Sequence, residues 1–152
     1  MPFADTAARR RWMGILAKAR PDEIAACWAR LARPPAYEML RRPETGLVMV
    51  RGRVGGDGPP FNVGEMAVTR CSVRLDDGTV GHAWIAGRVA VQAEQAAVLD
   101  ALLQRAGGQG DLADELHRLD LVHAARRDEA ACKAAATRVD FFTLVRGEAD
   151  RR

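Results

Sequence analysis

The run RCSVRLDDGTVGHAWI, Arg70 to Ile85, decides the fold of this chain. Asp77-Gly78 lies between two stretches of alternating residues, and this dipeptide is the preferred loop of a two-residue type I′ hairpin. A turn there sets the cross-strand pairs Leu75–Val80, Val73–His82 and Cys71–Trp84, whose side chains share one mostly apolar face. The other face then carries Arg70, Ser72 and Arg74, opposite Ile85, Ala83 and Gly81.

The residues before this hairpin continue the β pattern. Val48, Val50 and Val54 alternate with Met49, Arg51 and Arg53, which predicts a strand with one buried and one basic face. Whether the basic faces of the two regions coincide depends on strand register, and the sequence leaves that open.

A glycine-rich loop, GRVGGDGPPFNVGE, Gly52 to Glu65, follows that strand. A phosphate-binding P-loop needs a lysine and then a serine or threonine after its last glycine, and neither is present. Pro59 and Pro60 have no N–H to offer a phosphate, and the residues that follow read as a strand, not a helix. We therefore expect a strand-to-strand connection here, with a phosphate cradle as the disfavoured alternative.

Helical spacing lies on both sides of the β region. Trp12, Ile15, Leu16 and Ala19 predict a helix over about residues 5–19, and a second helix begins at Pro21 and stops before Pro34. After the sheet we expect helices over about 88–106 and 111–137, the second either continuous or broken near Asp120. The prediction is an α+β fold in a single domain, 1–152: an antiparallel sheet of about four or more strands, flanked by an N-terminal helical hairpin and C-terminal helices.

Composition excludes several classes of protein. The chain has 152 residues, 48% of them hydrophobic and 28% charged, which is ordinary for a globular protein. A net charge of +3 does not require a nucleic acid or an anionic membrane, although it permits a local anion site. No apolar run suits a signal peptide or a membrane span, so the cytoplasm is the expected compartment. The three cysteines are far apart and are expected to be reduced and buried.

The residue types that perform catalysis are few and poorly placed. His82 is expected on the apolar hairpin face, where a buried, hydrogen-bonded imidazole is favoured over a base or a ligand. Cys71 lies on the same expected face, so a Cys71–His82 dyad is conceivable, but a small buried thiol is favoured. Ser72 is the only serine and lacks the GxSxG context. No spacing supports a metal site, so none is predicted.

Arginines are the remaining functional lead. Five lie in or beside the predicted sheet and are candidate anion-binding residues, because guanidinium groups bind phosphates bidentately: Arg51, Arg53, Arg70, Arg74 and Arg88. A solvated basic face is the alternative. Nucleic acid is disfavoured as a partner, since only 5% of the residues are aromatic.

The C-terminal stretch VDFFTLVRG, residues 139–147, is unusually apolar and β-rich for a chain end. Such a segment either completes its own sheet or docks onto another subunit, and the pattern alone does not choose between them. Its candidate interface residues are Phe141, Phe142, Leu144 and Arg146.

Four stretches together resemble the PhnG family of phosphonate metabolism. They are RRRWMGILAKARPDE (residues 9–23), ETGLVMVRGRVGGDGPPFNVGEMAVTRCSVRLDDGTVGHAWIAGR (44–88), AEQAAVLDALLQ (93–104) and TRVDFFTLVRG (137–147). They occur in the family's order with similar spacings, so the resemblance covers nearly the whole chain.

The resemblance implies a subunit of the bacterial carbon–phosphorus lyase machinery. With its H, I and L companions it would take part in forming α-D-ribose 1-methylphosphonate 5-triphosphate, in which methylphosphonate displaces the adenine of ATP. A core complex of G, H, I and J subunits, two copies of each, is implied as well. ATP is then a substrate of the complex, and no cofactor is assigned to this chain. No catalytic residue is carried over, and a purely structural scaffold subunit is the alternative role.

One departure from the family concerns the run GRVAVQAEQ. Members of the family often have an acidic residue and then His-Ala-Glu after the Gly-Arg pair, whereas this chain has Val89 and Gln92 at those places. Arg88, Ala93 and Glu94 keep the pattern. Any role of the family's histidine is therefore not carried over to this chain.

Overall fold

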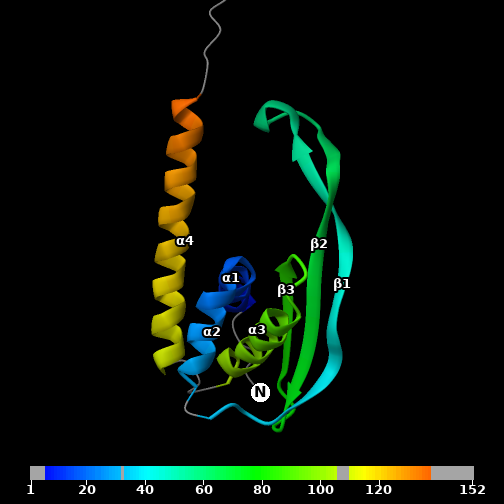
Figure 1. The fold of residues 1–152 in the computed structure, drawn as a ribbon, viewed down its shortest axis with the longest axis vertical. Coiled ribbons are helices and arrows are strands. Elements are labelled where there is room, and N and C mark those ends of the chain that lie inside the picture. Colours follow the sequence, from blue (N-terminus) through cyan, green and yellow to red (C-terminus); the bar gives the residue numbers. More distant parts are fainter. Residues whose placement is uncertain (1–5, 32, 106–109, 138–152) are drawn as a thin grey trace, which may run out of the picture.

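The computed structural model describes residues 6–31, 33–105 and 110–137, and it has an α+β fold (Figure 1). The elements are α1 (Thr6–Lys18), α2 (Pro21–Ala29), β1 (Tyr37–Arg53), the 3₁₀ turn η1 (Val54–Gly56), β2 (Pro60–Leu75), β3 (Val80–Ala86), α3 (Ala90–Leu103) and α4 (Gly110–Ala136). The strands form one antiparallel sheet in the order β1-β2-β3. The fold class is confirmed. The prediction of four or more strands was wrong for the described residues, which contain three; residues 139–147 lie outside them.

The N-terminal helical hairpin is confirmed. Pro21 is the first residue of α2, where its missing N–H costs nothing. The Glu23 carboxylate accepts a hydrogen bond from the Arg20 N–H at 2.8 Å, which satisfies one of the backbone donors that a helix start leaves free. The helix ends at Ala29, ahead of Pro34 and Pro35.

The hydrophobic core lies where α3 packs against one face of the sheet. The sheet contributes Cys71, Val73, Leu75, Ala83 and Ile85, all at most 4% exposed. The facing helix is rich in alanine, with Ala93, Ala96, Ala97 and Ala101 buried. Small side chains let the helix backbone come close to the sheet. The approach is closest at Gly81, where an added Cβ would lie 2.0 Å from the Ala97 carbonyl oxygen.

The register of the β2–β3 hairpin differs by one residue from the prediction. The Leu75 N–H bonds to the Thr79 carbonyl at 2.9 Å and the Gly78 N–H to the Leu75 carbonyl at 3.0 Å, so the loop has three residues, not two. Gly78 has φ +85°, the left-handed conformation that such a loop needs at its last position. Ser72 therefore pairs with His82, and Arg70 with Trp84.

A one-residue slip reverses which face every side chain occupies. His82 and Trp84, which we expected on the apolar face with Cys71 and Val73, are exposed on the opposite face. Gly81, Ala83 and Ile85, which we expected on the basic face, are buried in the core.

Strands β1 and β2 extend well beyond the end of β3. The last β2–β3 pair is Val68–Ala86, followed only by a Gly87 N–H bond to the Ala67 carbonyl at 2.8 Å. Residues 46–67 form a two-stranded ribbon, called the arm below, that projects from the body (Figure 1). The glycine-rich loop closes its tip through η1, where Gly58 N–H bonds to the Val54 carbonyl at 3.0 Å. The predicted strand-to-strand connection is confirmed.

The last described helix, α4, is a single helix of 27 residues. Of the two alternatives that the sequence left open, the continuous helix is the one observed, with no break near Asp120. The first half of α4 packs beside α1 and α2, and its second half continues past them toward the same end of the molecule as the arm (Figure 1).

Candidate functional site

The exposed face of the sheet brings together two of the five predicted anion-binding arginines and the Ser72 and His82 side chains. Arg70, Ser72 and Arg74 of β2 lie on this face with His82 and Trp84 of β3. The Arg70 guanidinium stands 5.6 Å from the centre of the Trp84 ring, a cation–π arrangement. His82 and Trp84 also border a hollow of about 220 Å³, whose other wall is Met13, Gly14, Leu16 and Ala17 of α1.

The arginines of this face are already paired. Arg70 Nε donates to Glu44 Oε1 at 2.6 Å, and Arg41 bonds to the same carboxylate. These two guanidinium groups lower the pKa of Glu44, which keeps it ionised. The Arg74 Nη1 atom lies 3.7 Å from a Glu38 oxygen. An incoming anion would have to compete with these carboxylates.

Ser72 and His82 form a hydroxyl–imidazole pair. Ser72 Oγ and His82 Nδ1 are 2.8 Å apart across the two strands. A serine nucleophile also needs a group that orients the imidazole and a donor site for an oxyanion. Among the described residues no side chain bonds to His82 Nε2, so the pair does not form a triad.

The conceivable Cys71–His82 dyad does not exist. Cys71 points into the core, on the opposite face of the sheet from His82. Burial raises the pKa of the Cys71 thiol to about 11, and the same cause raises the pKa of Cys27 to about 11. Both are buried as predicted, whereas Cys132 on α4 is exposed, contrary to the prediction.

The five predicted anion-binding arginines do not form one cluster. Arg70 and Arg74 share the sheet face, Arg51 and Arg53 lie near the tip of the arm, and Arg88 lies between β3 and α3. Arg53 Nη1 donates to the Gly58 carbonyl at 2.9 Å. Within the described residues, neither Arg51 nor Arg88 has an ion pair. Anion binding by this set stays a prediction.

Gln92, the residue at which the sequence resemblance implied a departure, is buried. Its Nε2 donates to the Ala19 carbonyl at 2.8 Å, tying α3 to the end of α1. The predicted interface residues Phe141, Phe142, Leu144 and Arg146 lie outside the described residues.

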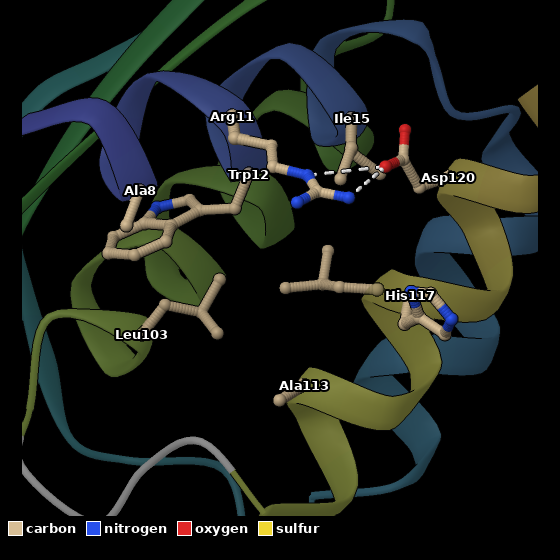
Figure 2. Close-up of a pocket in the computed structure, with 9 residues that line it drawn as sticks. Ala8, Arg11, Trp12, Ile15, Leu103, Ala113, His117 and Asp120 are labelled. Carbon is tan, nitrogen blue, oxygen red and sulfur yellow. Dashed lines mark hydrogen bonds and ion pairs between the residues drawn. The ribbon is translucent and has the colours of Figure 1, made fainter.

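A hollow that the sequence did not reveal lies between α1 and α4 (Figure 2). Its volume is about 260 Å³, and Trp12, Leu103 and Leu116 give it an apolar wall. Arg11 reaches across from α1 to Asp120 of α4, with Nη2 to Oδ2 at 2.7 Å (Figure 2). This pair lowers the pKa of Asp120. The two residues are 109 positions apart, so no local pattern could have predicted their meeting.

A further hollow between α1 and α4, of about 220 Å³, shares Arg11, Ile15 and Asp120 with the hollow of Figure 2. Its remaining charged and polar side chains are Arg10, Lys18, His123 and Arg127. We call it the basic hollow. None of its residues was predicted as a site residue. Its cations lie on helices whose sequences were used only to identify their apolar faces.

The arm exposes apolar side chains on both of its faces. Leu47, Val54, Phe61 and Val63 are 47% to 68% exposed, and Met49, Val50 and Met66 are 36% to 52% exposed. A concentration of exposed large apolar side chains is typical of interaction sites in folded proteins. The arm is therefore a candidate assembly surface.

The described residues hold neither a metal-binding cluster nor a helix that could span a membrane. No group of three or more His, Cys, Asp or Glu side chains could hold a metal ion. No helix is long and apolar enough to cross a membrane.

Comparison with known proteins identifies the family. Residues 7–147 match the family described as "Phosphonate metabolism protein PhnG". The chain is also 45% identical over 150 residues to a protein of Rhizobium meliloti (strain 1021), covering 95% of this chain and 93% of that protein. That relative is named alpha-D-ribose 1-methylphosphonate 5-triphosphate synthase subunit PhnG. Both matches confirm the resemblance seen in the sequence, and the chain belongs to the PhnG family.

Proposed function

We propose that this chain is an accessory subunit of the complex that makes alpha-D-ribose 1-methylphosphonate 5-triphosphate in phosphonate metabolism. The observation that carries the proposal is 45% identity, over 95% of the chain, to a protein named as a subunit of that synthase. In the proposed reaction methylphosphonate displaces adenine from ATP. The proposed partners are H, I, J and L companions, with two copies of this chain in the assembly.

The chemistry of the described residues supports an accessory role. The Ser72–His82 pair lacks an orienting group, the buried thiols have raised pKa values, and the sheet-face arginines are bound to carboxylates. A subunit that works beside a catalytic partner does not need a complete centre of its own.

The arm supports a role in assembly. Seven of its large apolar side chains are at least 36% exposed, and a two-stranded ribbon has too few neighbours to bury them itself. We propose that companion subunits of the synthase cover the arm.

Omission from a reconstituted reaction tests the proposal. The H, I and L companions, ATP and methylphosphonate are mixed with and without this chain, and adenine release and the triphosphate product are both measured. We expect product at background without the chain and restored product when the folded chain is added. Heat-unfolded chain is the control, and undiminished product in the absence of the chain would refute the proposal.

A purely structural scaffold is the second candidate, because Arg70 and Arg74 are engaged by Glu44 and Glu38 within the chain itself. A scaffold predicts that Arg70→Ala and Arg74→Ala leave turnover unchanged in the assembled complex. Loss of turnover with normal assembly would instead show that this face contributes to the reaction.

A further inference from the structure

The basic hollow concentrates positive charge that the described residues only partly neutralise. Four cationic side chains, Arg10, Arg11, Lys18 and Arg127, line it against one carboxylate, Asp120. Arg11 forms an ion pair with that carboxylate, with Nη2 2.7 Å from Oδ2. Within the described residues, Arg10, Lys18 and Arg127 have no ion pair. We propose that the basic hollow binds a phosphate-type oxyanion.

A second carboxylate beside the hollow, that of Glu23, is already engaged. Glu23 Oε2 lies 3.5 Å from Nε2 of His123, which borders the hollow. That carboxylate binds the Arg126 guanidinium and also accepts the Arg20 N–H at 2.8 Å. It is therefore not free to neutralise Arg10, Lys18 or Arg127.

Gly14 keeps the hollow open. Residues 10, 14 and 18 are spaced four apart, so Arg10, Gly14 and Lys18 form one stripe along α1. A glycine inside a helix is destabilising relative to alanine, and this one is not required by packing, since an added Cβ would meet no atom within 4 Å. The missing side chain leaves room between two cations.

The chemistry selects an oxyanion. Arginine presents a planar fork of donors that fits a phosphate bidentately, and lysine adds a compact charge. A volume of about 220 Å³ is many times what one water needs, so a phosphate group fits with its hydration. Converging cations in a concave site bind an anion more tightly than the same charges spread on a convex surface.

The ligand's phosphates have two possible sources, free polyphosphate or a nucleotide. The neighbouring apolar hollow shares Arg11 and Asp120 with the basic hollow and is large enough, at about 260 Å³, to receive a flat ring. A nucleotide would use both hollows, whereas a polyphosphate would use only the basic one. The probes below separate these cases.

Titration calorimetry on the full chain tests the site, with tripolyphosphate, ATP and adenosine as probes. We expect tripolyphosphate to bind, and Arg10→Gln and Arg127→Gln each to raise its Kd about tenfold, because each removes a charged hydrogen-bond donor. Arg42→Gln is the matched control: Arg42 is exposed on β1, away from the hollow, and the charge change is the same. Its Kd should stay within about twofold of the unmutated chain's.

Gly14→Leu provides an independent variant that fills the hollow without removing charge. We expect tripolyphosphate binding to be lost while circular dichroism and the melting temperature show an intact fold. Equal weakening by Arg42→Gln and Arg10→Gln would overturn the proposal, because it would indicate diffuse attraction. Tripolyphosphate binding that is unchanged in the Gly14→Leu variant would also overturn the proposal. So would a chain that binds adenosine but not tripolyphosphate.

The affinity for ATP, compared with that for tripolyphosphate, shows whether the bound phosphates belong to a nucleotide or to a free polyphosphate. Equal Kd values for ATP and tripolyphosphate indicate that phosphates alone are recognised, and tighter ATP binding indicates that the nucleoside adds contacts; both outcomes support the oxyanion site. The test is separate from the reconstitution experiment. A chain that is required for product formation but binds no tripolyphosphate would refute the site and leave the proposed function standing.

Discussion

At the scale of single residues, Gly81 and Asp100 fix how α3 lies on the sheet. Asp100 is fully buried and accepts hydrogen bonds from Trp12 Nε1 at 2.8 Å, Arg9 Nη2 at 2.8 Å and the His82 N–H at 2.9 Å. A buried carboxylate is tolerated only with such a set of donors. It links α1, β3 and α3 at one point, directly beside the glycine that lets the helix approach.

Gly81→Ala should destabilise the chain by about 3 kcal/mol, because its Cβ would fall 2.0 Å from the Ala97 carbonyl and 2.7 Å from the Ala101 nitrogen. Both are backbone atoms of α3, so a small side-chain movement cannot relieve the overlap. Urea unfolding of the full chain measures the effect. Gly64→Ala in the arm is the control, since its Cβ would meet nothing within 4 Å. Equal unfolding midpoints for the two variants would contradict the expectation.

At the scale of elements, a buried carboxylate at each end of α2 joins it to α4: Glu115 of α4 pairs with Arg30 after α2 at 3.1 Å, and Glu23 of α2 pairs with Arg126 of α4. Burial of Glu23 raises its pKa, but hydrogen bonds from Arg126, the Arg20 N–H and His123 outweigh burial and lower the pKa to about 2. Because Arg126 belongs to α4 and Arg20 precedes α2, ionised Glu23 holds the start of the hairpin's second helix against the longest helix.

Glu23→Gln should weaken the dependence of stability on pH under acid conditions. A carboxylate whose pKa is lower in the folded chain stabilises it above the unfolded-state pKa of about 4.5, and this contribution is lost as pH falls toward 2. The contribution at neutral pH is roughly 3 kcal/mol. Urea unfolding at pH 3, 5 and 7 measures it. Glu129→Gln, an exposed carboxylate on α4, should keep the steep acid dependence of the unmutated chain. A Glu23→Gln variant that keeps that steepness would refute the assignment.

The elements were largely predictable from the sequence, and the sites were not. Proline at the start of α2 and the Trp12–Ile15–Leu16 spacing identified the helices, because those signals are local. The loop at Asp77-Gly78 was located, yet its length was misjudged by one residue, and that error placed His82 and Trp84 on the wrong face. The basic hollow could not be predicted, since α1 and α4 meet only through tertiary packing.

At the scale of the whole molecule, two projections leave the same end of a compact body. The arm is one and the second half of α4 is the other, and they stand on opposite sides of α1 and β3 (Figure 1). The arm has little side-chain hydrogen bonding in the described structure: Arg53 Nη1 donates to the Gly58 carbonyl at 2.9 Å at its tip, and the Thr45 and Thr69 hydroxyls meet at 3.0 Å just below its base. Its side chains are therefore available to a partner.

Replacing two apolar side chains of the arm should reduce assembly without unfolding the chain. Phe61 and Val63 are 47% and 60% exposed, so Phe61→Ser with Val63→Ser should leave the melting temperature nearly unchanged. We expect recovery of companion subunits in a co-purification to fall at least about tenfold, as for residues central to an interface. Val91→Ser, at a 69% exposed position on α3, is the control and should assemble normally. Full recovery with the double variant would exclude the arm from the interface.

The arm also has a consequence for how such a chain is produced. Among the described residues no third strand pairs with the long edges of residues 46–67, so their backbone groups can template another strand, and companion subunits are proposed to cover them. A copy synthesised in excess of its companions would present those edges to other copies and to proteases. Balanced synthesis, more than a tighter core, then keeps the chain from aggregating. The arm thus makes the solubility of the chain depend on how closely its synthesis is matched to that of its companions.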